Sequence, residues 1–386
     1  MKRNHLIAAA ATLALGIAAP ASAAPYILTD LGDLPGGADG SQAFGINDAG
    51  QVAGYSTATT GNRAVLWSAG GGMQNLGDLP GGTDGSVAFG INNAGQVAGY
   101  SGATTGNRAF LWSAGGGMQN LGDLPGGTDV SAGNAINNAG QVAGYSGAAT
   151  GTRAFLWSAN GGMQDLGDLP GGSDSSLAYG INDAGQVVGY SSATTGTRAF
   201  LWSASGGMQN LGDLAGGSDS SLAYGINNAG QVVGYSVATT GSRAFLWSAS
   251  GGMQNLGDLP GGEDNSYAYG INDAGQVVGY SGAAGGSRAF LWTASGGMQD
   301  LNDLIDPASG FTLINARGIN AGGQIVGYGT KLVGTTTVTH AFLLTPGAVT
   351  GAVPEPATWA MMLLGFGGMG YILRRRAEVG ARIRFA

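Results

Sequence analysis

The chain has 386 residues, 77 of them glycine, no cysteine, and a formal net charge of −8. The absence of cysteine excludes a disulfide framework and thiolate chemistry. A hydrophobic content of 43% excludes a wholly disordered chain, and the lack of a Gly-X-Y triplet period excludes a collagen-like one. Between residues 24 and 350, 8 Lys and Arg residues stand against 21 Asp and Glu, a charge of −13 that excludes a basic nucleic-acid surface.

The N-terminal segment has the three parts of a secretory signal peptide. Lys2 and Arg3 precede an apolar run, and the small residues Ala21 and Ala23 end it. We therefore expect signal peptidase to remove residues 1–23 and the mature chain to begin at Ala24. A first transmembrane helix is the alternative, but the apolar run is too short to span a bilayer.

A 45-residue repeat fills the next part of the chain, residues 24–346. It is marked by six tryptophans at equal spacing, Trp67, Trp112, Trp157, Trp202, Trp247 and Trp292. The motifs GIN(D/N)AGQ, RAFLWS and MQ(N/D)L recur in step with them. A period of 40 to 50 residues with strand-like motifs is typical of propeller blades.

Each repeat predicts four short strands separated by glycine-rich turns. In the fourth copy these are residues 177–182, 186–191, 198–203 and 208–211. Both faces of such a sheet are apolar, because Phe200 and Trp202 point to one side while Ala199 and Leu201 point to the other. A sheet of this kind must lie between copies of itself, which favours an all-β propeller of four-stranded antiparallel blades.

The number of copies predicts how the ring closes. The Gly-Ile-Asn stretch or its variant occurs seven times, whereas MQ(N/D)L occurs six times. The missing fourth strand has a counterpart at Tyr26–Leu31, which precedes the same Gly-Asp-Leu ending. We therefore predict a seven-bladed ring whose last blade is completed by the N-terminal strand. A linear solenoid of stacked sheets is the alternative, and it would need capping repeats at both ends.

The repeat units resemble those of the HAF-repeat family of extracellular bacterial proteins. The triplet that gives the family its name is present once, at His340-Ala341-Phe342, and the other units have Arg in place of His. The resemblance implies an exported repeat protein and transfers no catalytic residue.

Two sets of charged residues recur with the repeat. One arginine precedes each third strand, at Arg63, Arg108, Arg153, Arg198, Arg243 and Arg288. Aspartate pairs flank the LPGG or LAGG turns, at Asp78 and Asp84, Asp123 and Asp129, Asp168 and Asp174, and Asp213 and Asp219. The arginines could bind an acidic polysaccharide or pair with the aspartates. The aspartates could form turns, hold calcium or act as a glycosidase pair.

Breaks in the repeat mark the candidate ligand site. The innermost strands carry an aromatic column of Phe44, Phe89, Tyr179, Tyr224 and Tyr269, which Asn134 and Arg317 interrupt. These two residues are the candidate ligand contacts, and drift of the repeat is the alternative explanation. We predict no catalytic residue, no cofactor and no metal-histidine site, with calcium as the alternative cofactor; His340, the one histidine after residue 5, is expected to be framework.

The C-terminus resembles a PEP-CTERM sorting signal of Gram-negative bacteria. A linker and the Pro354-Glu355-Pro356 motif occupy residues 347–356, Trp359 follows, an apolar run reaches residue 373, and a basic tail covers residues 374–386. The arginines of that tail are Arg374, Arg375 and Arg376. The apolar run predicts a transmembrane helix over residues 357–373 with the arginines on the cytoplasmic side. The resemblance implies processing by an exosortase, and a simple tail anchor is the alternative.

These features together predict an exported, non-enzymatic propeller at the cell surface or in an exopolysaccharide matrix. It would be held transiently in the membrane by the C-terminal helix before processing. The alternative is a secreted polysaccharide lyase or hydrolase on the same scaffold, since propellers serve both roles. An enzyme should concentrate unlike titratable residues in one or two blades, whereas these repeats are nearly alike.

Overall fold

In the computed structural model of the chain, the described residues are 25–82 and 84–347. The predicted signal peptide, the transmembrane helix over residues 357–373, the sorting motif and the basic tail lie outside these ranges. No helix within the ranges is long and apolar enough to cross a membrane.

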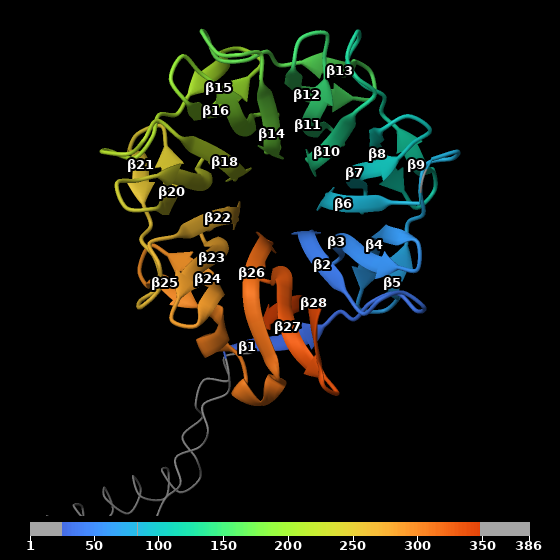
Figure 1. The fold of residues 1–386 in the computed structure, drawn as a ribbon, viewed down its shortest axis with the longest axis vertical. Helices are drawn as coiled ribbons and strands as arrows, with labels where there is room; N and C mark the ends of the chain where they lie inside the picture. Colours follow the sequence, from blue (N-terminus) through green and yellow to red (C-terminus); the bar gives the residue numbers. More distant parts are fainter. Residues whose placement is uncertain (1–24, 83, 348–386) are drawn as a thin grey trace, which may run out of the picture. The chain divides into compact units, whose positions relative to one another are not determined.

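The described chain forms seven sheets of four antiparallel strands, arranged as blades around an axis (Figure 1). The strands of blades 1 to 3 are β2 (Ser41–Ile46), β3 (Val52–Ala58), β4 (Gly61–Ser68), β5 (Gly72–Asn75); β6 (Ser86–Ile91), β7 (Val97–Gly102), β8 (Asn107–Ser113), β9 (Gly117–Asn120); and β10 (Ser131–Ile136), β11 (Val142–Gly147), β12 (Thr152–Ser158), β13 (Gly162–Asp165). Those of blades 4 to 6 are β14 (Ser176–Ile181), β15 (Val187–Ser192), β16 (Thr197–Ser203), β17 (Gly207–Asn210); β18 (Ser221–Ile226), β19 (Val232–Val237), β20 (Ser242–Ser248), β21 (Gly252–Asn255); and β22 (Ser266–Ile271), β23 (Val277–Ala283), β24 (Gly286–Thr293), β25 (Gly297–Asp300). Blade 7 consists of β26 (Phe311–Ile319), β27 (Ile325–Val333), β28 (Thr336–Pro346) and β1 (Tyr26–Asp30).

Two 3-10 helices connect blade 6 to blade 7. They are η1 (Leu301–Leu304) and η2 (Pro307–Ser309), and each is capped by an aspartate, Asp300 and Asp306, whose side chain accepts a backbone N–H bond. The other connections between consecutive blades are Gly-Asp-Leu segments followed by turns. The seven-bladed all-β architecture predicted from the repeat count is thus confirmed.

Each blade contributes its aromatic residues to a core that it shares with the preceding blade. Phe200 and Trp202 of blade 4 are 0% and 7% exposed, and they cluster with Ala154 and Leu156 of blade 3. Burying about 200 Å² of an aromatic side chain contributes on the order of 5 kcal/mol before entropy is counted. The apolar character of both faces of the repeat is therefore explained by packing between blades.

The innermost strands approach one another so closely that they need small residues. The β14–β15 register shifts between Ala178 and Gly180. A Cβ atom on Gly180 would lie 2.8 Å from the carbonyl oxygen of Tyr224 in the next blade. Such a contact is too short for a side chain, so glycine recurs at this place in the Gly-Ile-Asn motif.

The N-terminal strand closes the ring. Strand β1 pairs antiparallel with β28, from Tyr26 opposite Pro346 to Asp30 opposite Phe342, at the outer edge of the C-terminal blade (Figure 1). The Leu31 N–H continues the pairing by donating to the Ala341 carbonyl at 3.0 Å. This confirms the closure predicted from the six copies of MQ(N/D)L, with the strand ending one residue earlier than expected.

Charged side chains reinforce the closure. His340 is 4% exposed, and its Nδ1 and Nε2 atoms lie 2.9 Å from Asp30 and 2.5 Å from Asp39. Lys331 also forms an ion pair with Asp30. Burial raises the pKa of Asp30, but hydrogen bonds from Lys331, the Gly32 N–H and His340 outweigh it and hold that pKa below its usual value. The carboxylate of Asp30 thus stays charged where the two chain ends meet.

Candidate ligand site of the central channel

The seven innermost strands surround a channel that is polar at one end and aromatic at the other. The polar end is lined by the isoleucine and asparagine of each Gly-Ile-Asn motif and by the residue that follows. The aromatic end lies beyond the glycines and isoleucines of the same strands. The two ends differ because successive residues of a strand occupy successive depths of the channel.

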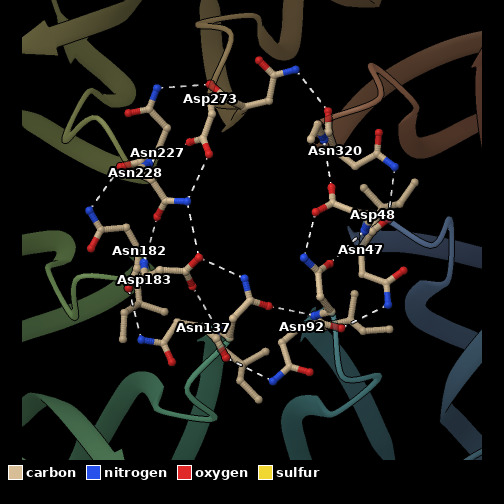
Figure 2. Close-up of a pocket in the computed structure, with 18 of the residues that line it drawn as sticks. Asn47, Asp48, Asn92, Asn137, Asn182, Asp183, Asn227, Asn228, Asp273 and Asn320 are labelled. Carbon is tan, nitrogen blue, oxygen red and sulfur yellow. Dashed lines mark hydrogen bonds between the residues drawn. The ribbon is translucent and has the colours of Figure 1, made fainter.

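At the polar end, seven buried asparagines join the blades in a closed ring (Figure 2). The Asn182 side chain donates to the Asn227 carbonyl at 3.1 Å, and the last of the seven, Asn320, donates to the Asn47 carbonyl at 3.0 Å. The other five bonds repeat this geometry in Asn47, Asn92, Asn137, Asn227 and Asn272. Each bond links one blade to the next, so the ring ties all seven together.

The same asparagines hold the turns that follow them. Asn182 Nδ2 also donates to Gln186 Oε1 at 2.8 Å, and its Oδ1 accepts the Gln186 backbone N–H at 2.9 Å. Asparagine and glutamine recur four residues apart in all seven blades, ending with Asn320 and Gln324. Sequence reasoning treated this stretch only as a tight turn and missed the ring. The signal that could have revealed it was the strict recurrence of both amides.

The rim of the polar end carries three carboxylates, Asp48, Asp183 and Asp273 (Figure 2). Each accepts a hydrogen bond from an asparagine amide of an adjacent blade, at 2.8 to 3.0 Å. The rim is therefore acidic, and its oxygens already bridge neighbouring blades.

At the aromatic end, the predicted aromatic column forms the wall of a cavity of about 380 Å³. Its lining residues are Gln42, Phe44, Phe89, Asn134, Tyr179, Tyr224, Tyr269 and Arg317. Adjacent rings lie 5.3 Å apart for Phe44 and Phe89 and 4.9 Å apart for Tyr224 and Tyr269, measured between centroids. The structure thus brings together every member of the column and both residues that interrupt it.

Arg317 places the one guanidinium group of this cavity beside the aromatic rings. Its Cζ lies 4.0 Å from the centroid of Tyr269 and 5.6 Å from that of Phe44. Among the described residues, no carboxylate lies within 4.0 Å of it, and its buried Nε has no hydrogen-bond partner. The positive charge is therefore held by ring faces and remains available to an anion.

Asn134, the other interruption, has a structural partner. Its side-chain amide donates to the Ala178 carbonyl of the next blade at 2.7 Å. Asn134 occupies the place of an aromatic ring between Phe89 and Tyr179, so the aromatic wall is interrupted on that side of the cavity.

The tyrosines of the wall keep their hydroxyl groups protonated and neutral at ordinary pH. Burial raises the pKa of Tyr179, Tyr224 and Tyr269 above the usual value. Rings with neutral hydroxyls can pack against apolar surface and also exchange hydrogen bonds with a ligand.

The repeated arginines lie away from this cavity, in ion pairs. Each of the first five contacts an aspartate on the segment that leads into the next blade: Arg63 and Asp84 (3.3 Å), Arg108 and Asp129 (2.7 Å), Arg153 and Asp174 (2.6 Å), Arg198 and Asp219, and Arg243 and Asp264 (2.9 Å). Hydrogen bonding and the nearby charge of Arg153 lower the pKa of Asp174. The pairing interpretation of the arginines accounts for this geometry. Seven of the eight carboxylates considered for calcium lie within 4.0 Å of a guanidinium nitrogen, and among the described residues Asp213 is the exception.

One further group in the described part of the chain has the composition of a metal site. Asp33, Asp39 and His340 each offer one ligand atom within 4.8 Å of the others. This group occupies, in blade 7, the place of the arginine and its two aspartates in the other blades. Both ring nitrogens of His340 already lie against carboxylates, Nδ1 against Asp30 and Nε2 against Asp39.

Comparison with known proteins gives two sequence matches. Residues 162–341 match a family described as a protein of unknown function (DUF3466), and residues 352–376 match the PEP-CTERM protein-sorting motif. A search of curated proteins gave no match. Membership of the HAF-repeat family stays a prediction.

Several solved structures are similar in outline. TolB from Acinetobacter baumannii aligns with a TM-score of 0.44 and 11% identity over 84% of this chain and 80% of its own. A putative gluconolactonase aligns at 0.37 and 12% (84% and 93%), and Porphyromonas gingivalis dipeptidyl peptidase 4 at 0.30 and 11% (79% and 39%). TM-scores below 0.5 carry no functional inference. The C-terminal match, by contrast, implies an exported propeller protein that an exosortase sorts to the cell surface or the extracellular space.

Proposed function

We propose that this protein is a non-enzymatic surface or matrix component that binds an acidic exopolysaccharide at the aromatic end of its channel. The PEP-CTERM motif supports the location. The observation that carries the binding role is Arg317, a guanidinium without a carboxylate partner among the described residues, in a cavity walled by aromatic rings.

The ligand class follows from the two kinds of surface in the cavity. A guanidinium binds a sugar carboxylate through charge-assisted hydrogen bonds. The rings of Tyr224 and Tyr269 offer apolar area to the C–H face of a pyranose, and their hydroxyls can exchange hydrogen bonds with it. A uronate-bearing polysaccharide presents both groups, which makes it the chemistry we assign to this site.

The proposed role is binding without catalysis because the cavity has few groups that could transfer a proton. Its wall contains no Asp, Glu or His, and burial raises the pKa of the tyrosines. A polysaccharide lyase or hydrolase needs a base or a pair of carboxyl groups beside the bond that breaks.

A glycan array tests the proposal directly, using a fragment of residues 25–347. This fragment contains the whole closed ring and its cores. We expect binding to uronate-bearing glycans, and we expect Arg317→Gln to weaken it about tenfold or more, the loss of one charge-assisted contact. Asp306→Asn, in the connection between blades 6 and 7, is the matched surface control.

Bond cleavage is measured in the same samples as new reducing ends and as absorbance of unsaturated uronates. Cleavage of any polysaccharide would replace the binding role with the lyase or hydrolase alternative. Uronate binding that is equal in wild type and Arg317→Gln would refute the channel site. Repeating the array with and without calcium tests the predicted independence from a cofactor.

A further inference from the structure

Blade 6 carries a second cavity, of about 430 Å³, that has no counterpart in the sequence predictions. Its wall combines Glu263, Asn265, Tyr267 and Tyr280 with the tip of the β23–β24 hairpin. We call this cavity the blade-6 groove. It lies outside the channel, between that hairpin and the segment that enters the blade.

The groove is open because its usual cover is missing. In blades 4 and 5 a Cβ atom on the hairpin glycine, Gly196 or Gly241, would lie 1.9 to 2.0 Å from the carbonyl oxygen of an aspartate in the next connection. The corresponding Gly286 of blade 6 has no atom within 4 Å. The connection that follows blade 6 has the sequence LNDLIDPASG, forms η1 and η2, and does not cover the hairpin.

The arginine of blade 6 is also more exposed than its equivalent in blade 5. The Arg243 side chain of blade 5 is 10% exposed and pairs with Asp264 at 2.9 Å. The Arg288 side chain is 25% exposed, and its ion pair is with Asp300 at 3.9 Å. Two independent features, a glycine and an arginine, thus mark one uncovered hairpin.

The groove has also gained side chains that neighbouring repeats lack. Glu263, Asn265 and Tyr267 stand where blade 5 has Ser218, Ser220 and Leu222. Glu263 is the one glutamate between residues 1 and 354, and it is exposed. The three changes therefore fall together in the uncovered blade.

Tyrosine rings form one side of the groove. Tyr267 and Tyr280 are stacked, with centroids 4.8 Å apart and planes 12° from parallel, and Tyr235 packs against Tyr267 at 4.5 Å. The stack fixes Tyr267 and Tyr280, so a ligand meets a rigid aromatic wall at little entropic cost. Asn265 Oδ1 accepts the Ser242 N–H at 3.1 Å, which holds its amide in place and leaves the amide N–H groups as donors.

The wall of the groove contacts the wall of the channel cavity. Tyr280 lines the groove, Tyr269 lines the channel cavity, and their ring centroids are 6.0 Å apart. One extended ligand can therefore contact both places, with Arg317 beyond Tyr269.

We propose that the blade-6 groove binds an uncharged, hydroxyl-rich sugar residue of the polysaccharide whose uronate occupies the channel end. The inference rests on the proposed function for the identity of the polymer. Tyrosine edges and hydroxyls, an amide and a single carboxylate suit the alternating apolar and hydroxyl groups of a neutral pyranose. The carboxylate of Glu263 accepts hydrogen bonds from sugar hydroxyls and repels a second uronate.

The test uses the sequence of the adjacent blade to erase the groove. The variant Glu263→Ser/Asn265→Ser/Tyr267→Leu restores the residues of blade 5, which pack in the same fold. Calorimetric titration of residues 25–347 uses cello-, malto- and mannohexaose as neutral probes and hexamers of alginate and polygalacturonate as acidic ones.

We expect at least one neutral hexasaccharide to bind wild type and to lose about tenfold or more in affinity in the triple variant, the effect of roughly 1.4 kcal/mol. Asp306→Asn, which lines neither cavity, should leave this neutral binding within about threefold. An unchanged thermal midpoint checks the fold of each variant.

Absence of neutral binding, or equal affinity in wild type and triple variant, overturns the groove. Failure of the channel site has a different signature, since acidic hexamers would then bind wild type and Arg317→Gln equally.

Discussion

At the scale of single residues, the asparagine ring shows how a buried polar group can specify a fold. Asn227 is 4% exposed and uses both amide hydrogens and its oxygen, toward Gln231 and the Asn272 carbonyl. A buried amide with all partners present stabilises modestly, while one with a missing partner costs the full desolvation of that group. Because each bond crosses to the next blade, the same amide also fixes the angle between blades.

Asn227→Asp should destabilise the protein although the side chains have the same shape. The new carboxylate places an acceptor opposite Gln231 Oε1 and the Asn272 carbonyl, where two donors were. We expect a loss of about 1 to 3 kcal/mol, read as a lower urea midpoint. The matched control is Asn210→Asp, since blades 3 and 6 have Asp165 and Asp300 there naturally. Equal midpoints for the two variants would contradict the role of the ring.

Asp30 should make the ring closure sensitive to acid. The pKa of Asp30 is lower in the folded protein than in the unfolded chain, where it is about 3.9. The charged carboxylate therefore stabilises the fold above the unfolded pKa, and this stabilisation is lost as the pH falls through the lower folded pKa. Asp30→Asn should therefore lower the thermal midpoint at pH 7, and the difference from wild type should shrink below about pH 4. Melting curves from pH 3 to 7 measure this, and a constant difference would exclude the effect.

Residue positions could be predicted from the sequence where equivalent residues of the repeats can be aligned with one another. The aromatic column with Asn134 and Arg317 could be aligned directly, and the structure gathers it in one cavity. The recurrence of the amides marks them as structural, but it does not identify the partner of each asparagine side chain, which is a backbone carbonyl of the next blade. The blade-6 groove was not predicted, because it exists where the connection between blades 6 and 7 leaves the β23–β24 hairpin uncovered.

At the scale of elements, ring closure depends on one short strand. Strand β1 has five residues and pairs with the last strand of the chain. Tyr26 is 8% exposed and belongs to the core cluster of the last blade, with Phe342 and Leu344. Without β1 the β28 edge would be open and that core would lose its outer side.

Deletion of residues 26–34 should lower the thermal midpoint of the protein by many degrees and promote self-association. Adding a synthetic peptide of residues 25–34 in excess should restore the midpoint, since binding to the folded state stabilises it by mass action. A peptide of the same composition in scrambled order is the control. A deletion variant as stable as wild type would show that closure by β1 is dispensable.

The strand positions themselves were largely readable from the sequence. In blade 4 the predicted segments 177–182, 186–191, 198–203 and 208–211 differ from the observed strands by at most one residue at each end. Turn glycines fix these ends, as with Gly185 and Gly196, which have φ of 74° and 71°. The two 3-10 helices were not predicted, because blade 7 departs from the repeat there.

At the scale of the whole molecule, neighbouring blades share their cores, so no blade is an independent folding unit. The cluster around Phe200 and Trp202 includes Ala154 and Leu156 of the preceding blade, and the cluster around Phe245 and Trp247 repeats the pattern with blade 4. Closure removes the two free ends at which a linear repeat array would begin to unfold.

We therefore expect residues 25–347 to unfold in one cooperative transition. Tryptophan fluorescence, which reports on blades 1 to 6, and far-UV circular dichroism should give coincident urea curves. Phe200→Ala should move the single transition to lower urea, by about 3 to 5 kcal/mol, without splitting it. A separate early transition in that variant would show that blades unfold individually.

The pairing of β1 with β28 also sets an order of events during export. With the predicted signal peptide at the N-terminus, translocation would deliver that end first, yet Asp30 meets its partner His340 only after a further 310 residues. Each earlier blade completes itself with a fourth strand a few residues beyond its third, so local hairpins occupy those edges before β1 can compete for them. Only the last blade is left with an edge to fill. On that order of export, the first strand to cross is the last to be used, and folding cannot finish before the whole ring has been exported.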